Sequence, residues 1–334
     1  MKKTLLALAV MAAAGSVNAA EVFKNEDMSV DLYGQIRENV EFSDADGKDQ
    51  TQINEGSTRF GFNIAYDVND DLAILGTVEI AADGAELRQH YVGFASDTYG
   101  TITFGKQAPL YDDIYGAIYT WYYDLAPYGK TFEDNFWQDS AMRYQFSNDD
   151  FWVKGQYNLP ENNKNVEMGE LYVGKSFGDL SLHIGGAFNK DQTTSTFKLD
   201  PKDGVKAGGT VNDTQGTYGE ITAEYALGEG TVGATYTYYK FEDKKDSKND
   251  EESNGFHISA IFPVAEKTSV YGLYQYFDFD GDKDETQNFV LGAEYKFFPR
   301  AFFYTEYNFN KAERATAAED DTQNNVTIGT RIYW

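Results

Sequence analysis

Apolar and polar side chains alternate with a period of two along most of the chain. In the segment 30–42 one face carries Val30, Leu32, Ile36, Val40 and Phe42, and the other carries Asp31, Tyr33, Gln35, Arg37 and Asn39. Successive side chains of a β-strand point to opposite faces, so this spacing predicts a strand with one apolar face. The pattern recurs to the C-terminus and predicts about sixteen strands in all.

Tight turns and longer polar loops alternate between these predicted strands. The turns lie at 68–71, 178–179 and 227–230, where Asn, Asp and Gly are concentrated. The longer connections, among them 241–254 and 311–323, are acidic. The alternation alone leaves two classes open, because the half-buried strands of a soluble sandwich have the same period.

The N-terminal residues have the pattern of a secretory signal peptide. Lys2 and Lys3 precede an apolar run at 5–14, and small residues end at Ala19. That run is shorter than the ~20 residues that a spanning helix needs. We therefore predict a signal peptide at 1–19 and a single β-barrel domain at 20–334.

Composition narrows the class further. The chain has 54 acidic and 28 basic residues, no cysteine, 25 Tyr and 24 Phe. Its negative charge argues against a nucleic-acid partner, and the missing cysteines exclude disulfides and thiolate chemistry. Secretion, abundant Tyr and Phe, and unequal loops favour an outer-membrane barrel with a polar interior. Such a sheet has to close, because lipid leaves no partner for a free edge.

Short motifs stand at 30–34, 59–62, 99–106, 292–295 and 306–310, and the last strand closes on Trp334. In this order, over nearly all of the mature chain, they resemble one family, the trimeric general-diffusion porins of Gram-negative outer membranes. The resemblance implies an all-β, antiparallel barrel of sixteen strands, a third loop folded into the lumen, and a homotrimer in the outer membrane.

The resemblance also implies a pore constriction with basic side chains on the barrel wall. Arg59 and Arg88 match the family's wall arginines. Gln35 stands where a lysine is common, and Arg37 and Arg143 are candidates to replace that charge. The alternative for each arginine is pairing or snorkelling at a rim, but charged residues here alternate away from the apolar face.

The acidic side of the constriction is expected on the third loop, predicted at 107–135. Asp124 matches a retained loop acid, and Tyr128 replaces a second one. Four other loop acids are candidates to compensate: Asp112, Asp113, Glu133 and Asp134. The loop is also rich in aromatic residues, which either pack it against the wall or form a stacking track for sugars.

Three further features shape the expected function. The net charge of −26 predicts a weak preference for cations by field focusing. The second loop, at 81–86, is short for a latch between subunits. Asp278, Asp280 and Asp282 have an alternating spacing, but the nearby glycine comes too early for an EF-hand. We predict a solvated loop that meets lipopolysaccharide through divalent ions, and no dedicated metal site.

No catalytic residue or cofactor is predicted. His257 and Ser259 share a strand face, but no third orienting group accompanies them, and a catalytic triad is defined by geometry. The sequence predicts a porin that passes ions and small hydrophilic solutes by passive diffusion. Two alternatives remain: an oligosaccharide-specific channel that uses the third-loop aromatics, and a barrel with an adhesive or structural role for its loops.

Overall fold

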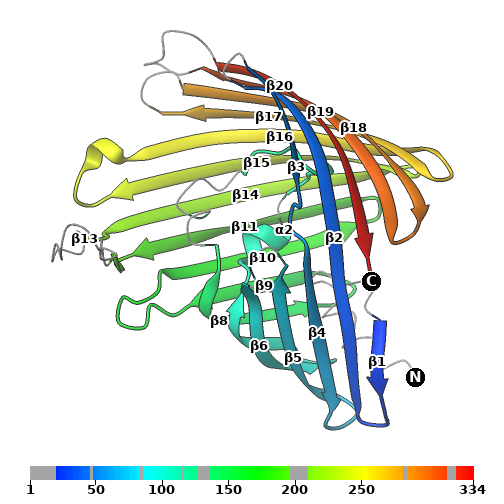
Figure 1. Ribbon diagram of the computed structural model, residues 1–334. Helices are drawn as coiled ribbons and strands as arrows, with labels where there is room; N and C mark the ends of the chain where they lie inside the picture. Colours follow the sequence, from blue (N-terminus) through cyan, green and yellow to red (C-terminus); the bar gives the residue numbers. More distant parts are fainter. Residues whose placement is uncertain are drawn as a thin grey trace, which may run out of the picture.

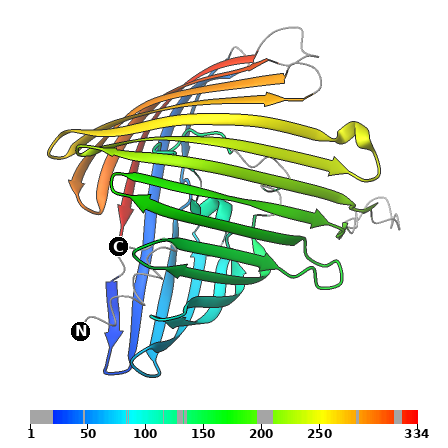
Figure 2. The same ribbon diagram turned by 180° about the vertical axis from the view of Figure 1, so that it is seen from behind.

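The computed structural model forms a closed antiparallel barrel with sixteen strand positions (Figures 1 and 2). It describes residues 20–45, 48–82, 84, 86–114, 116–126, 132, 136–195, 210–280, 284–313 and 321–334. The barrel strands are β1 (Ala20–Lys24), β2 (Met28–Ala45), β3 (Lys48–Asn54), β4 (Arg59–Asp67), β5 (Leu72–Ala81), β6 (Leu87–Ser96), β7 (Gly100–Gln107), β8 (Gln138–Ser147), β9 (Trp152–Asn158), β10 (Glu167–Phe177), β11 (Leu180–Asp191), β14 (Thr214–Leu227), β15 (Gly230–Asp243), β16 (Glu251–Ala265), β17 (Thr268–Phe279), β18 (Asp284–Phe298), β19 (Ala301–Glu313) and β20 (Asp321–Tyr333).

Four short elements lie in the described parts of the connections. The helix α2 (Leu110–Ile114) follows β7, the 3-10 helix η1 (Ser247–Asn249) follows β15, and β12 (Thr194–Ser195) pairs with β13 (Thr210–Val211) in a separate small sheet. Within the described ranges, no helix has the length and apolar character to cross a membrane.

The two ends of the chain close the barrel beside β2. The upper part of β2 pairs with β20 and its lower part pairs with β1, so β1 and β20 share one strand position. Gly34 and Trp334 exchange backbone hydrogen bonds of 3.1 and 3.2 Å at the junction. On its other edge β2 pairs with β3 and then β4. The pairing of β20 with β2 closes the sheet on itself, as a spanning sheet requires.

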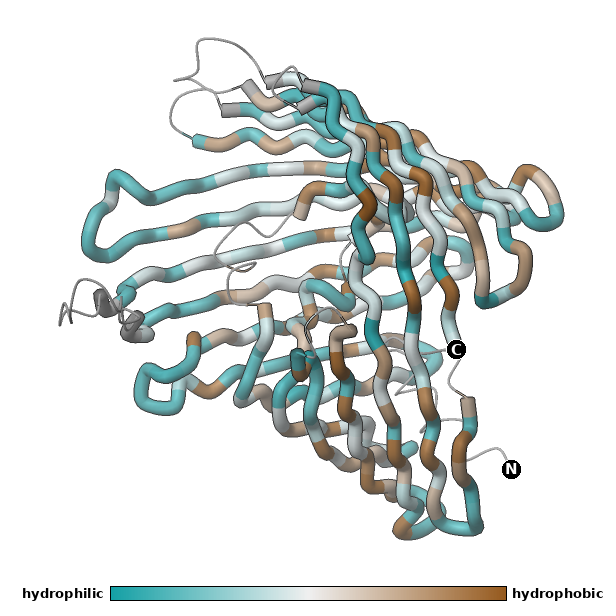
Figure 3. The backbone as a smooth tube through the Cα atoms, viewed as in Figure 1, coloured by the Kyte–Doolittle hydropathy of each residue, from teal (hydrophilic) through white to brown (hydrophobic). Residues whose placement is uncertain are grey.

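The strands point their apolar side chains outward and their polar ones inward. On β4 the outward Phe62 and Ile64 are each 42% exposed, whereas the inward Asn63 is 5% exposed. Figure 3 shows the same alternation as brown and teal steps along the strands. This arrangement inverts that of a soluble barrel and is typical of strands that face lipid outside and water inside.

Short turns lie at the end of the barrel that carries both termini, and the longer connections lie at the other end. The strand segments that the sequence predicts are confirmed, including the weaker ones near 87–95, 99–106, 167–177 and 268–277. The predicted length of the loop at 241–254 is wrong. β15 continues to Asp243 and β16 begins at Glu251, because the ladder extends with cross-strand pairs such as Lys240 opposite Glu252.

Candidate functional site

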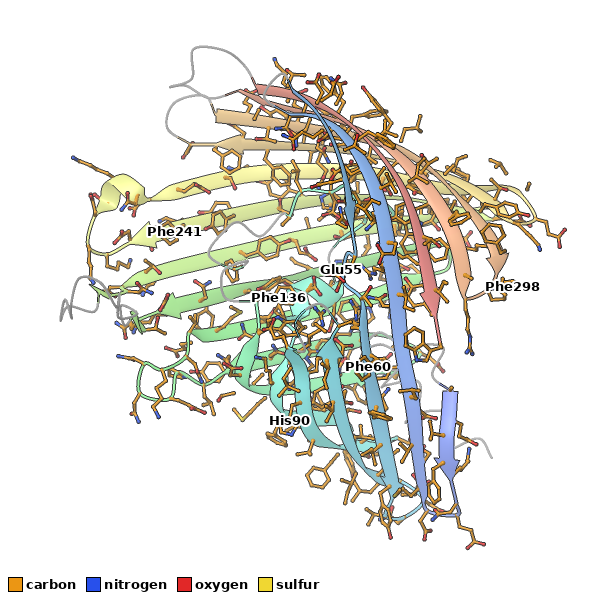
Figure 4. The ribbon with its side chains drawn as sticks, viewed as in Figure 1. Glu55, Phe60, His90, Phe136, Phe241 and Phe298 are labelled. Carbon is orange, nitrogen blue, oxygen red and sulfur yellow. The ribbon has the colours of Figure 1, made fainter. Side chains whose placement is uncertain are left out.

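The third loop, between β7 and β8, folds into the lumen. Its first turn is α2, where Leu110 and Tyr111 are 0% and 1% exposed. They belong to a buried cluster with Tyr172, Tyr218 and other wall side chains, against which Phe136 also packs. In Figure 4, Phe136 lies beside α2 in the middle of the barrel, whereas Phe298 lies at the rim. An apolar contact therefore anchors the start and the end of the loop inside a polar lumen.

The loop then approaches the wall so closely that it needs a glycine. Gly116 has a φ of +64°, and a Cβ atom there would lie 2.6 Å from Thr235 Oγ1 and 2.9 Å from His257 Nε2. The next residue, Ala117, donates its N–H to the same Thr235 hydroxyl at 2.9 Å. Any side chain at 116 would push the loop away from β15 and β16.

A buried carboxylate holds the middle of the loop. Glu306 on β19 is 1% exposed and accepts the backbone N–H groups of Trp121, Tyr122 and Tyr123 at 2.5, 3.1 and 2.9 Å. The Tyr271 hydroxyl donates to the same carboxylate at 3.0 Å. Charge-assisted bonds of this kind are stronger than neutral ones, so Glu306 fixes the loop's position across the lumen.

The aromatic side chains of the loop donate hydrogen bonds from their polar atoms to carboxylates of the wall. The Tyr119 hydroxyl donates to Glu224 at 2.6 Å, and the Trp121 indole N–H donates to Glu294 at 3.0 Å. The Tyr123 hydroxyl donates to Glu41 at 2.9 Å. Burial, with Glu41 adding to it, raises the pKa of the Tyr123 hydroxyl above its ordinary value, so it stays a neutral donor.

Arg59 and Arg88 lie side by side in the lumen and share one carboxylate. Their Nε atoms lie 3.4 and 2.8 Å from the two oxygens of Glu79, which is 2% exposed. The strand pairing shifts between Glu79 and Ile80, and Arg88 is the extra residue of that bulge. A bulge redirects a side chain, and here it directs Arg88 toward Glu79 and over the Trp137 ring, 4.6 Å from its centroid.

Arg37 and Gln35 lie one step further around the same wall. Gln35 is 3% exposed and donates to the Ser57 carbonyl at 2.7 Å, so it supports the 55–58 segment beneath the arginines. Arg37 lines the main cavity of the lumen. Its direct cross-strand neighbour is Arg331 on β20, which the sequence reasoning did not single out. Arg331 donates to the backbone carbonyl of Trp121, and its guanidinium group lies over the Trp121 ring, 4.7 Å from the ring centroid.

Arg143 has a different environment from the other arginines. It is 5% exposed, pairs with Asp113 at 2.7 Å, and donates to Gln156 at 2.6 Å and to the Ala108 carbonyl. Both members of the Arg143–Asp113 pair are therefore engaged at the root of the third loop.

The lumen holds a cavity of about 950 Å³ beside the loop. Arg37, Arg59 and Arg88 line it from the wall, Asp112 lines it from α2, and Lys164 lines it from the fourth loop. Burial, with Asp113 adding to it, raises the pKa of Asp112 to about 6, against the opposing effect of Arg59 and Arg88. The site thus places a titratable acid opposite a row of arginines.

The remaining sequence predictions are placed as follows. Asp124 lies on the loop close enough to influence Asp112 electrostatically. Tyr128, Glu133, Asp134 and Asp282 lie outside the described residues. Asp278 ends up in β17 and Asp280 just after it, and no group of three potential metal ligands occurs among the residues that the structure describes. Ser259 accepts the Tyr119 N–H at 3.3 Å and donates to the Gly272 carbonyl at 3.0 Å.

Sequence reasoning missed Glu306, Glu41 and Arg331. All three occupy polar positions between outward apolar ones, so the alternation could have placed them in the lumen. Nothing local indicates what they bind there, because Glu306 and its Trp121 partner are 185 positions apart.

A closed barrel with an apolar outer surface, and with a charged lumen narrowed by an inward loop, is a membrane-spanning channel. The sequence model of the Gram-negative porin family matches residues 5–315, and the chain belongs to this family. The expected family, fold and outer-membrane location are confirmed, and the protein is a porin for passive diffusion.

The chain is similar to outer-membrane proteins of several bacteria. Outer membrane protein U of Vibrio parahaemolyticus is 23% identical over 99% of both chains. The structure of outer-membrane-expressed OmpT of Vibrio cholerae is 32% identical, with a TM-score of 0.80, and covers 94% of this chain and 100% of its own. An anion-selective porin from Comamonas acidovorans shares the fold, at 17% identity and a TM-score of 0.74 over 92% of this chain and 100% of its own.

Proposed function

We propose that the barrel is one pore of a homotrimer, that it passes ions and small hydrophilic solutes down their gradients, and that it catalyses no reaction. The observation that carries the proposal is the third loop, which Glu306 and Thr235 hold against the wall and which leaves a cavity lined by charged side chains beside it. A loop held by many bonds sets a constant cross-section, and a constant cross-section filters solutes by size.

We expect the charges that line the cavity to orient the solutes that pass through it. Arginines lie on the wall and Asp112 lies on the loop side, so a transverse field crosses the path of a permeating solute. Such a field is stronger in a narrow space with low-dielectric walls than in bulk water. We expect it to orient dipolar solutes without holding them.

The third-loop aromatics support general diffusion over a sugar track. Sugar recognition needs exposed rings with free hydrogen-bonding groups nearby, yet the Tyr119, Trp121 and Tyr123 polar atoms are bonded to wall carboxylates. Liposome swelling tests the choice. Uptake that falls smoothly with solute mass is expected, and saturable block of ion current by oligosaccharides would contradict it.

The outer surface supports assembly and lipid contact. A solved OmpT of Vibrio cholerae, 32% identical, is described as a trimer form. β6, which follows the second loop, presents Val92 and Phe94 outward, 59% and 47% exposed. We propose that this face packs against a neighbouring subunit, and that the rest of the apolar surface contacts membrane lipid and lipopolysaccharide.

Two outward substitutions of equal chemistry test the assembly. Phe94→Lys should convert the trimer to monomer on an unheated gel, while Ile258→Lys on β16, 49% exposed, should leave the trimer intact. Both carry a similar cost of about 2–4 kcal/mol for a charge facing lipid, so only the interface distinguishes them. An unmodified protein that runs as a monomer in mild detergent would contradict the homotrimer while leaving the channel in place.

A further inference from the structure

Of the four arginines on one part of the lumen wall, only two form an ion pair with a carboxylate of the described residues. β20, β2, β4 and β6 contribute Arg331, Arg37, Arg59 and Arg88 to one part of the wall, where β5 lies between β4 and β6. Glu79 pairs with Arg59 and Arg88. Among the residues that the structure describes, no carboxylate lies within ion-pair distance of Arg37 or Arg331.

Arg37 and Arg331 are also an unfavourable pair. They lie directly opposite each other on adjacent strands, where like charges destabilise a sheet. The Nε atoms of both are buried without a hydrogen-bond acceptor, and Arg331 as a whole is only 7% exposed. Two facing guanidinium groups that lack an anion have their charge and donors satisfied best by an anionic solute.

The acids that could offset this charge are mostly engaged elsewhere. Glu306 and Glu41 accept hydrogen bonds from the third loop, and Asp113 is paired with Arg143. Asp112 faces the cavity, but its pKa of about 6 leaves it partly protonated in mildly acidic conditions. Among the described residues that line the cavity, four are basic (Arg37, Arg59, Arg88 and Lys164) and two are acidic (Asp112 and Asp139), so their summed charge has the opposite sign to the net charge of the chain.

We propose that Arg37, backed by Arg331 and flanked by Arg59, forms a subsite for small doubly charged oxyanions of the phosphate class, and that it gives the pore an anion preference. The guanidinium fork matches two oxygens of such an anion, and a second arginine adds attraction without blocking access. The proposal rests on the channel function and names the solutes that this pore favours. It is the opposite of the cation preference that the net charge predicts.

Planar-bilayer recordings with the full-length protein test the subsite. Under a KCl gradient, the sign of the reversal potential reports which ion passes more easily. Adding potassium phosphate to one side then reports binding as a saturable fall in chloride current. The unmodified pore should give the anion sign and a saturable phosphate effect.

Two substitutions and one control isolate Arg37. Arg37→Gln should move the reversal potential toward cations and weaken the phosphate effect about tenfold. The side chain of Arg37 donates no hydrogen bond within the described residues, so this variant should fold. Arg37→Lys should keep the sign but lose phosphate affinity. Arg300→Gln removes the same charge at an exposed turn and should change neither.

The outcomes separate the subsite from the channel. A cation-sign potential and no phosphate effect in a conducting channel would overturn the subsite alone. Equal shifts in Arg37→Gln and Arg300→Gln would also overturn it, because net charge would then explain them. An absence of conductance steps from folded protein would overturn the channel and the subsite together.

Discussion

The lumen has two contrasting walls. On the wall from β14 to β19, the acids Glu224, Glu294 and Glu306 accept hydrogen bonds from the third loop. On the wall of β2, β4 and β6, Arg37, Arg59 and Arg88 face the cavity. Arg59 and Arg88 share Glu79, whereas Arg37 has no carboxylate within ion-pair distance among the described residues. The acidic wall therefore holds the loop, and the basic wall faces the solute. A large negative net charge on a porin does not determine the charge that a permeating ion meets.

The largest effect should come from loosening the acidic wall. Glu306→Gln removes the charge that holds three backbone N–H groups and places an amide donor among them. We expect a local loss of about 3 kcal/mol, a wider and more variable channel, and increased current noise. Single-channel conductance and its open-state noise measure this.

The control for Glu306→Gln makes the same chemical change outside the lumen. Glu266 lies exposed in the turn after β16, and Glu266→Gln should leave the channel unchanged. If Glu306→Gln also kept a steady conductance of the unmodified value, the acidic wall would not be what positions the loop.

A smaller effect is expected at Gly116, where the loop contacts the wall through uncharged groups. Gly116→Ala places a Cβ atom 2.6 Å from Thr235 Oγ1, at a φ of +64° that already strains a side chain. Gly178→Ala carries the same strain, at a φ of +65°, but meets no atom within 4 Å. Both variants should lose about 1–2 kcal/mol from the backbone.

Comparing the two glycine variants isolates the contact of loop and wall. The temperature of thermal unfolding should fall for both variants, whereas the single-channel conductance should change in Gly116→Ala alone. Identical conductance in the two would show that the loop can shift at Gly116 without altering the pore.

The comparison of the two walls also shows which features could be predicted from the sequence and which could not. Alternation predicted the strands because lipid outside and water inside impose opposite polarity on neighbouring positions, as for Phe62 and Asn63. It predicted that Arg59 faces inward for the same reason, but it could not predict the bulge that turns Arg88 into the lumen. It could not predict that Arg143 pairs with Asp113, or that Glu306 binds the loop, because these bonds depend on where residues 108–137 lie in space.

Strand ends were the least predictable part of the fold. The acidic stretch at 241–254 is typical of a loop in composition, yet Lys240 and Glu252 lie opposite each other in a continuing ladder. Charged side chains suit a strand that has left the membrane and is solvated on both faces. Composition alone cannot separate such an extension from a loop.

The smallest expected effect comes from titrating Asp112, which lines the cavity opposite the basic wall. Burial and Asp113 raise the pKa of Asp112 to about 6, so the carboxyl is mostly ionised at pH 7.5 and mostly protonated at pH 4.5. Protonation removes a negative charge from the cavity. The reversal potential under a KCl gradient should therefore move further toward anions as the pH falls, with a midpoint near 6. Asp112→Asn should hold the protonated value throughout and abolish that step. Asp113→Asn should keep the step but lower its midpoint, because it removes the charge that helps to raise the pKa of Asp112. If the reversal potential of Asp112→Asn still changed with pH at the same midpoint, another group would be responsible for the titration, and Asp112 would not control the charge opposite the basic wall.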